Sequence, residues 1–192
     1  NPLILICSLA VATQCALGDS ITLTGTVRDF VSPGIAGEPG YLGHPDFEGT
    51  IGGLQTGAVQ NTLGADGKPV WNTLKDGFTS EAAFNQWYNN TPGVNAWAPL
   101  SITLENNGSG IYTYNNQEFF PIDNQLLGNQ GRGHNFHFTF ELHSQFTYQT
   151  GQEFSFTGDD DLWLFINDQL VVDLGGVHGA VNGSVDLDTL GL

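Results

Sequence analysis

The chain has 192 residues, which is enough for one domain with a sizeable hydrophobic core. It carries 4 Lys and Arg against 20 Asp and Glu, which gives a formal net charge of -16. Because such an acidic surface repels phosphate backbones, the composition argues against nucleic acid as a partner. Charged residues are few while glycine and aromatic residues are many, as is typical of a strand-rich extracellular module.

Residues 1–18 form an apolar segment that resembles the core of a secretory signal. The segment is too short to span a bilayer comfortably, and Ala16-Leu-Gly18 has the small-residue pattern of a cleavage site. If it stays attached, residues 3–17 must bury themselves, for example as a strand in their own or a neighbouring sheet. Both cysteines, Cys7 and Cys15, lie in this segment, so a bridge between them is conceivable but residues 19–192 cannot depend on an internal disulfide.

The segment Ile21–Phe30 alternates apolar and small polar residues, which predicts a strand. A long glycine-rich stretch, Gly34–Lys75, follows and has no periodicity. Loops of that length are uncommon unless they are functional or pinned by contacts. We expect His44-Pro-Asp46 to fix this loop through a turn and local hydrogen bonds.

One helix is predicted near residues 80–88. Thr79 or Ser80 can cap its N-terminus, and Glu81 complements the positive end of the helix dipole. Apolar and aromatic residues recur at four-residue spacing, and Asn89-Asn-Thr-Pro-Gly93 ends the helix.

The remaining elements are predicted to be strands. His134–Tyr148 is the clearest, because apolar residues occupy its even positions and polar residues its odd ones, which gives one core face and one polar face. Leu162–Ile166 is apolar at both parities, as expected for a central strand covered on both faces. Further strands are predicted at residues 100–105, 111–114, 118–122, 170–173 and 184–188. The pattern predicts an all-β antiparallel sandwich or barrel with one short helix.

Three consecutive carboxylates, Asp159, Asp160 and Asp161, lie between two of these apolar segments. Like charges in adjacent positions repel, and their burial is costly unless a cation neutralises them. This favours a calcium site, because calcium takes 6–8 oxygen ligands. The alternative is a solvated acidic turn. Adjacent side chains of a strand point to opposite faces, so two of them can hold one ion only where the backbone departs from strand geometry.

The chain resembles a fibro-slime domain, a subgroup of the anthrax-protective-antigen-type β-sandwich. The resemblance covers nearly everything after residue 20. Domains of the family continue with further strands beyond the position of Leu192. The matching motifs are Gly25-Thr-Val-Arg-Asp-Phe30, His44-Pro-Asp-Phe-Glu48, Phe119-Phe-Pro-Ile-Asp123, His134-Asn-Phe-His-Phe-Thr139, Phe156-Thr-Gly-Asp-Asp-Asp-Leu-Trp-Leu-Phe-Ile166, Leu170-Val-Val-Asp-Leu-Gly-Gly-Val-His-Gly179 and Gly183-Ser-Val-Asp-Leu-Asp-Thr-Leu190.

The resemblance implies a way of binding sugar. Lectin members of the wider superfamily hold calcium with two neighbouring aspartates joined by a cis peptide, and the ion ligates vicinal hydroxyls of the sugar. The corresponding positions here are Asp159 and Asp160. A glycine is usual at the next position, where this chain has Asp161, so the pair could be shifted by one residue.

The superfamily completes the ion shell from a second loop, which the resemblance does not locate securely in this chain. The nearest candidates are Asp173 as a metal ligand and, as ligand-binding residues, Gly175, Gly176, His178 and Asn182. The competing interpretation of the segment 175–179 is a tight turn whose glycines provide positive φ.

The sequence predicts no enzyme, because adjacent aspartates cannot supply the separated carboxylates of a glycosidase and no nucleophile elbow or nucleotide fingerprint is present. We expect a secreted or surface-displayed module that binds glycans or polysaccharide through Ca²⁺ in adhesion or extracellular matrix. The alternative is a structural filament or matrix subunit that self-associates by strand addition through residues 3–17.

Overall fold

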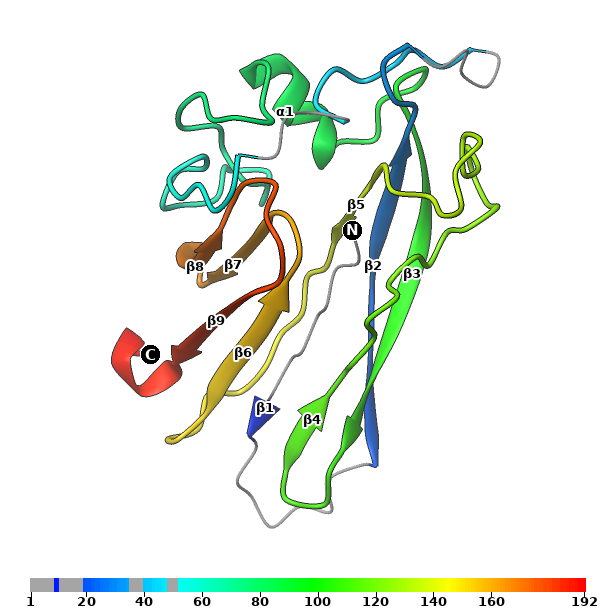
Figure 1. Ribbon diagram of the computed structural model, residues 1–192. Coiled ribbons are helices and arrows are strands. Elements are labelled where there is room, and N and C mark those ends of the chain that lie inside the picture. The colour runs from blue at the N-terminus through cyan, green and yellow to red at the C-terminus, as the bar shows by residue number, and fades with distance from the viewer. Residues whose placement is uncertain (1–8, 11–18, 35–39, 48–51) are drawn as a thin grey trace.

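The computed structural model describes residues 9–10, 19–34, 40–47 and 52–192, and of β1 only the backbone pairing. Most regular elements are strands, which lie in two groups with the helix α1 and several long loops gathered at one end (Figure 1). This confirms the predicted all-β architecture. Cys7 and Cys15, and most of the segment 1–18, lie outside the described residues.

The larger layer is an antiparallel sheet in the order β1-β4-β3-β2-β5. Its two long strands pair continuously from Ser20↔Glu105 to Phe30↔Asn95. The strands of this layer are β1 (Leu9–Ala10), β2 (Ser20–Phe30), β3 (Asn95–Asn106), β4 (Ile111–Thr113) and β5 (Phe138–Glu141).

Two antiparallel hairpin-like pairs form the other layer (Figure 1). β6 (Glu153–Gly158) pairs with β9 (Val181–Asp186), and β7 (Leu162–Ile166) pairs with β8 (Gln169–Leu174). A 3₁₀ turn, Leu187–Leu190, follows β9. The segment between β6 and β7 is therefore only three residues long, and it contains the three aspartates.

The main hydrophobic core lies between the two layers. Buried Ile102 and Leu104 of β3 pack in one cluster with Phe156 of β6 and Val172 of β8. Burial of these side chains from both layers is what holds the sandwich together.

A smaller aromatic cluster lies under α1 (Glu81–Trp87), whose N-cap is Ser80, as predicted. The Ser80 hydroxyl accepts a hydrogen bond from the Ala83 amide at 3.1 Å. Phe84 and Trp87 of the helix pack against Trp163 of β7 with ring centroids 5.9 and 6.4 Å apart. Strand β7 is thus covered on both faces, as its composition predicted, although β8 is its only partner among the described strands.

The long loop that contains His44 is pinned as expected. Both Asp46 carboxylate oxygens accept hydrogen bonds, Oδ1 from the Thr79 amide at 2.9 Å and Oδ2 from the Trp87 indole at 2.9 Å. His44 is buried, and its Nε2 faces the Ala83 carbonyl at 3.2 Å. The loop therefore contacts α1 along its length, from Thr79 before the helix to Trp87 at its end.

One predicted strand is too long and another is absent. Of the segment 134–148 only β5 is a strand, and residues 118–122 are irregular, with Phe119 buried. Alternation of apolar and polar residues indicates which face of a segment is covered. A strand also needs the backbone of a neighbouring strand to pair with. β2 provides that partner only opposite Phe138–Glu141. No described helix is long and apolar enough to cross a membrane.

Candidate functional site: the aspartate loop

The aspartate loop, residues 159–161, leaves strand geometry at its central residue. Asp160 adopts a φ of +81°, and its amide donates to the His178 carbonyl at 3.2 Å. This places the aspartate loop beside the segment 175–179, which contains several of the residues named as candidates for the second loop. The peptide bond between Asp159 and Asp160 is trans, so the cis bond implied by the lectin resemblance is not what turns the chain here.

Two carboxylate oxygens of this loop are buried without a partner. They are Asp159 Oδ1 and Asp160 Oδ1, and neither has a hydrogen-bond donor among the described residues. Burial raises the pKa of both carboxyls, and the charge of Asp159 raises that of Asp160 further. A buried acceptor without a donor is costly, more so when it is ionised, and a cation between the two would remove that cost.

The other two predicted metal ligands already have protein donors. Asp161 Oδ1 accepts from the Gly176 amide at 2.6 Å, and burial raises the pKa of this carboxyl to about 7. Asp173 accepts at both oxygens, from the Gly57 amide at 2.7 Å and from the Trp163 indole at 2.9 Å. These contacts tie the aspartate loop and β8 to their surroundings, whereas Asp159 and Asp160 keep free acceptors.

Gly175 and Gly176 allow two loops to touch backbone to backbone. The Gln55 amide donates to the Gly175 carbonyl at 2.5 Å, and the Gly53 amide donates to the Val177 carbonyl at 3.0 Å. Gly176 has a φ of +101°, and a Cβ there would clash with the Gly53 carbonyl. The tight-turn interpretation accounts for both glycines, and the Gly176 amide in addition fixes Asp161.

His178 lies within this turn and Asn182 follows it in β9. His178 is buried, and its two ring nitrogens face backbone carbonyls, Nε2 that of Leu174 at 3.1 Å and Nδ1 that of Gly179 at 2.7 Å. Asn182 is on the outer face of β9, where its Oδ1 accepts from the Thr157 hydroxyl at 2.6 Å. Neither ring nitrogen of His178 is therefore free for a ligand, whereas Asn182 is exposed.

Asn182 belongs to a shallow hollow on the outer face of β6 and β9. The hollow has a volume of about 310 Å³ and is lined by Ser155, Thr157, Asn182, Gly183 and Ser184. All of its side chains are uncharged hydroxyls or amides, and Thr157, its last residue from β6, is two residues before Asp159. Such a surface can exchange hydrogen bonds with the hydroxyls of a sugar.

Within the described residues, no three His, Cys, Asp or Glu side chains are arranged to hold a metal ion. Any cation at the aspartate loop must therefore take most of its ligands from carbonyls, water or a bound molecule.

The segment 52–57, which supports both Gly175 and Asp173, was not predicted from the sequence. It lies about 120 residues away from them in a stretch with no periodicity.

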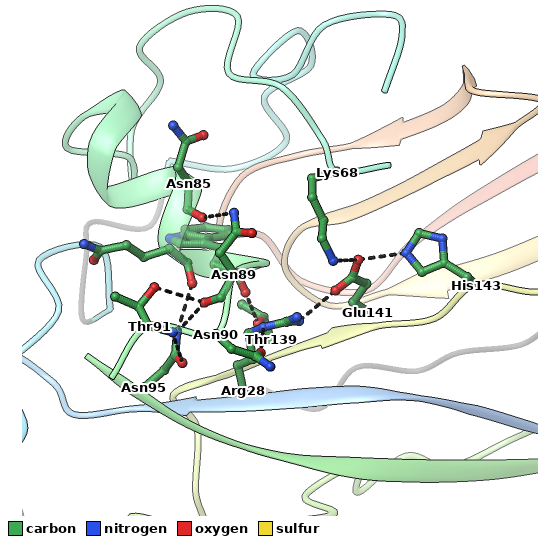
Figure 2. Close-up of polar contacts among 12 residues, drawn as sticks. Arg28, Lys68, Asn85, Asn89, Asn90, Thr91, Asn95, Thr139, Glu141 and His143 are labelled. Carbon is green, nitrogen blue, oxygen red and sulfur yellow. Dashed lines mark hydrogen bonds and ion pairs between the residues drawn. The ribbon is translucent and has the colours of Figure 1, made fainter. Parts of the chain in front are cut away.

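A second polar centre, around Glu141 of β5, also went unpredicted. Its carboxylate is bound by Arg28 at 2.8 Å, by His143 at 2.7 Å and by Lys68, as Figure 2 shows. Two of the four Lys and Arg residues in the chain thus meet at one carboxylate. Burial raises the pKa of Glu141, but the hydrogen bonds and charges of Lys68, His143 and Arg28 outweigh burial and lower it. The one feature of the sequence that could have indicated this centre is the small number of Lys and Arg residues in so acidic a chain.

Residues 121–191, which include the aspartate loop, match the PA14 domain, a module of the carbohydrate-binding and adhesion type. No solved structure matches the chain.

The chain is also similar to psi proteins of Dictyostelium discoideum. It is 43% identical to the protein psiQ over 73% of this chain and 16% of psiQ, and 36% identical to psiD over 91% of this chain and 36% of psiD. It is 41% identical to psiR over 78% of this chain and 17% of psiR. The chain thus spans between about a sixth and a third of the length of the curated relatives it matches.

Proposed function

We propose that this chain is a secreted, calcium-dependent carbohydrate-binding module of the fibro-slime type that acts in adhesion or extracellular matrix. The observation that carries the proposal is the pair of buried carboxylate oxygens on Asp159 and Asp160 that lack hydrogen-bond donors. They occur in the part of the chain that matches the PA14 domain, and the resemblance to the lectins implies that they correspond to the calcium-binding aspartate pair.

Calcium suits these residues chemically. It is a hard cation that prefers carboxylate and carbonyl oxygens and accepts irregular coordination shells, so two carboxylates with carbonyls and water can hold it. Among the described residues of the aspartate loop and the segment 175–179, only these two keep a buried carboxylate oxygen without a donor. The ion therefore keeps coordination positions that a pair of vicinal sugar hydroxyls can fill. Asp160 is held in place by the backbone of His178.

The shallow hollow beside the loop supplies the rest of the sugar contact. A glycan that reaches the ion with one ring would lay its next ring over Thr157 and Asn182, whose polar groups suit uncharged hydroxyls. The net charge of -16 disfavours acidic glycans at this face. We therefore propose neutral glycans as the ligands.

The experiment is a glycan array probed with the full chain in calcium and again in chelator. We expect binding that chelator abolishes and that Asp159→Asn and Asp160→Asn both lose. Asp19→Asn, an exposed carboxylate directly before β2, is the control and should bind like the parent. Glycan binding that persists unchanged in chelator would overturn the proposal.

One observation favours a second candidate function, a filament or matrix subunit. Leu9–Ala10 forms β1, which pairs with β4 at the edge of the five-stranded sheet. The same pairing made with the β4 of a neighbouring copy would join chains by strand exchange.

Light scattering over a range of protein concentrations tests this second function. A mass that rises with concentration and falls in Ala10→Pro, which removes an amide donor, supports it; a constant monomer mass contradicts it.

A further inference from the structure

A cavity distant in sequence from the aspartate loop lies between α1 and the loop 66–70. Its volume is about 260 Å³, and none of its lining residues comes from the aspartate loop, from 175–179 or from the hollow on β6 and β9. The proposed calcium site therefore does not account for it.

One wall of the cavity is aromatic and aliphatic. Tyr88, which directly follows α1, is half-buried there, and Phe84 packs edge-on behind it with ring centroids 6.1 Å apart. Val70 faces the cavity from the opposite loop. An aromatic side chain in this position provides a flat apolar surface on which the C–H face of a ring can lie.

Two amide side chains, Asn85 of α1 and Asn89 just after the helix, also line the cavity. Asn85 and Asn89 are four residues apart, and Asn89 Nδ2 donates to the Asn85 carbonyl at 2.7 Å (Figure 2). This bond orients the Asn89 amide and leaves its oxygen available, while the exposed Asn85 amide has both a donor and an acceptor to offer.

The charge at the cavity mouth selects against anions. Asp66 and Glu81 are exposed carboxylates there, whereas the ammonium group of Lys68 is occupied by Glu141. The lining therefore has uncompensated negative charge, which repels uronates, sialic acids and phosphates. Carboxylates and amides both form hydrogen bonds with hydroxyls, so an uncharged polyol is the ligand that satisfies every group.

We propose that this cavity is a second saccharide site, one that takes a single neutral sugar ring stacked on Tyr88 and hydrogen-bonded by Asn85 and Asn89. The volume is just below the range of about 300–1,000 Å³ that is usual for drug-sized ligands, which suits one ring. The site needs no metal, so it works independently of Asp159 and Asp160.

The test is an NMR titration of the isotope-labelled full chain, in chelator, with four methyl glycosides: of glucose, galactose, mannose and N-acetylglucosamine. Methyl glucuronide and choline serve as anionic and cationic probes. We expect at least one neutral glycoside to shift the amide signals of residues 81–89, with a dissociation constant in the millimolar range, and neither charged probe to do so. Asn85→Ala should weaken binding about fivefold, because it removes one or two hydrogen bonds to the sugar. Asn61→Ala, an exposed amide outside the cavity, should not.

Three results would overturn the proposal: no shift with any neutral glycoside, equal affinity of the Asn85→Ala and Asn61→Ala variants, or binding of choline alone. Because the titration runs without calcium, its outcome is separate from that of the aspartate loop. A sugar that binds only after calcium is restored, and that Asp160→Asn abolishes, would support the calcium site and contradict the second one.

Discussion

Carboxylates that look alike in the sequence differ in whether the protein gives them a hydrogen-bond donor. Asp161 and Asp173 accept from amides or an indole, and each of those contacts fixes a loop. Asp159 and Asp160 each keep a buried oxygen without a donor. A stabilising role explains the first pair, and a bound cation is the partner that we propose for the second.

Asp29 of β2 carries a pH prediction. It is fully buried, and burial raises the pKa of its carboxyl from 3.8 to about 7 despite hydrogen bonds from Asn135 and Leu127. Because the folded pKa lies above the unfolded one, the protonated group stabilises the fold fully below pH ~4, and this contribution is lost as the pH rises through 7.

We therefore expect Asp29→Asn, which cannot ionise, to gain stability relative to the parent between pH 5 and pH 8, by at most ~3 kcal/mol. Urea unfolding of both proteins at the two pH values measures this difference, and other titrating groups cancel in it. Asp19→Asn is the exposed control. A difference between Asp29→Asn and the parent that is the same at pH 5 and pH 8 would show that Asp29 is ionised in the folded protein.

Glu141 carries a stability prediction. Its carboxylate is the shared partner of Arg28, which is 4% exposed, and of Lys68. Removal of the anion leaves a buried guanidinium unpaired, so Glu141→Gln should lower the free energy of unfolding by about 3–5 kcal/mol. Glu105→Gln, on the exposed end of β3, should change it by less than about 0.5 kcal/mol. Equal effects of the two substitutions in urea unfolding would mean that the Glu141 network is not a stabilising unit.

At the scale of the element, the turn between β8 and β9 offers a matched pair of glycines. Gly176 has a φ of +101° and no room for a Cβ, whereas a Cβ on Gly179 would meet nothing within 4 Å. We expect Gly176→Ala to destabilise the fold by about 1–3 kcal/mol and to weaken calcium binding, because it displaces the support of Asp161. Gly179→Ala should leave both unchanged. Calorimetric titration with calcium and thermal unfolding check this, and wild-type-like behaviour of Gly176→Ala would contradict it.

Elements with a local signal were predictable from the sequence. The capping Ser80 and the four-residue spacing after it located α1 within one residue at each end. The alternation in Ile21–Phe30 located β2 equally well. The alternation in residues 134–148 did not, because only Phe138–Glu141 lies opposite β2 and the rest of the segment pairs with no described strand.

For the whole molecule, the sandwich was predictable because most chain segments carry a strand pattern and share one core. The candidate site was only half predictable. Adjacent aspartates and a glycine turn are visible in the sequence, and the structure brings them together through the bond from Asp160 to His178. The role of the segment 52–57 and the formation of the cavity beside α1 depend on contacts between residues that are distant in the sequence. No local sequence pattern predicts such contacts.

The most direct test of the calcium site is the melting temperature of the full chain as a function of free calcium, with chelator as the zero point. At a hundredfold excess over the dissociation constant, calcium binding to the folded state should raise the melting temperature by about 5–10 °C. The rise should saturate, should disappear in Asp159→Asn and in Asp160→Asn, and should persist in Asp19→Asn. A folded protein whose melting temperature does not respond to calcium would contradict the calcium site and make the aspartate loop an acidic turn.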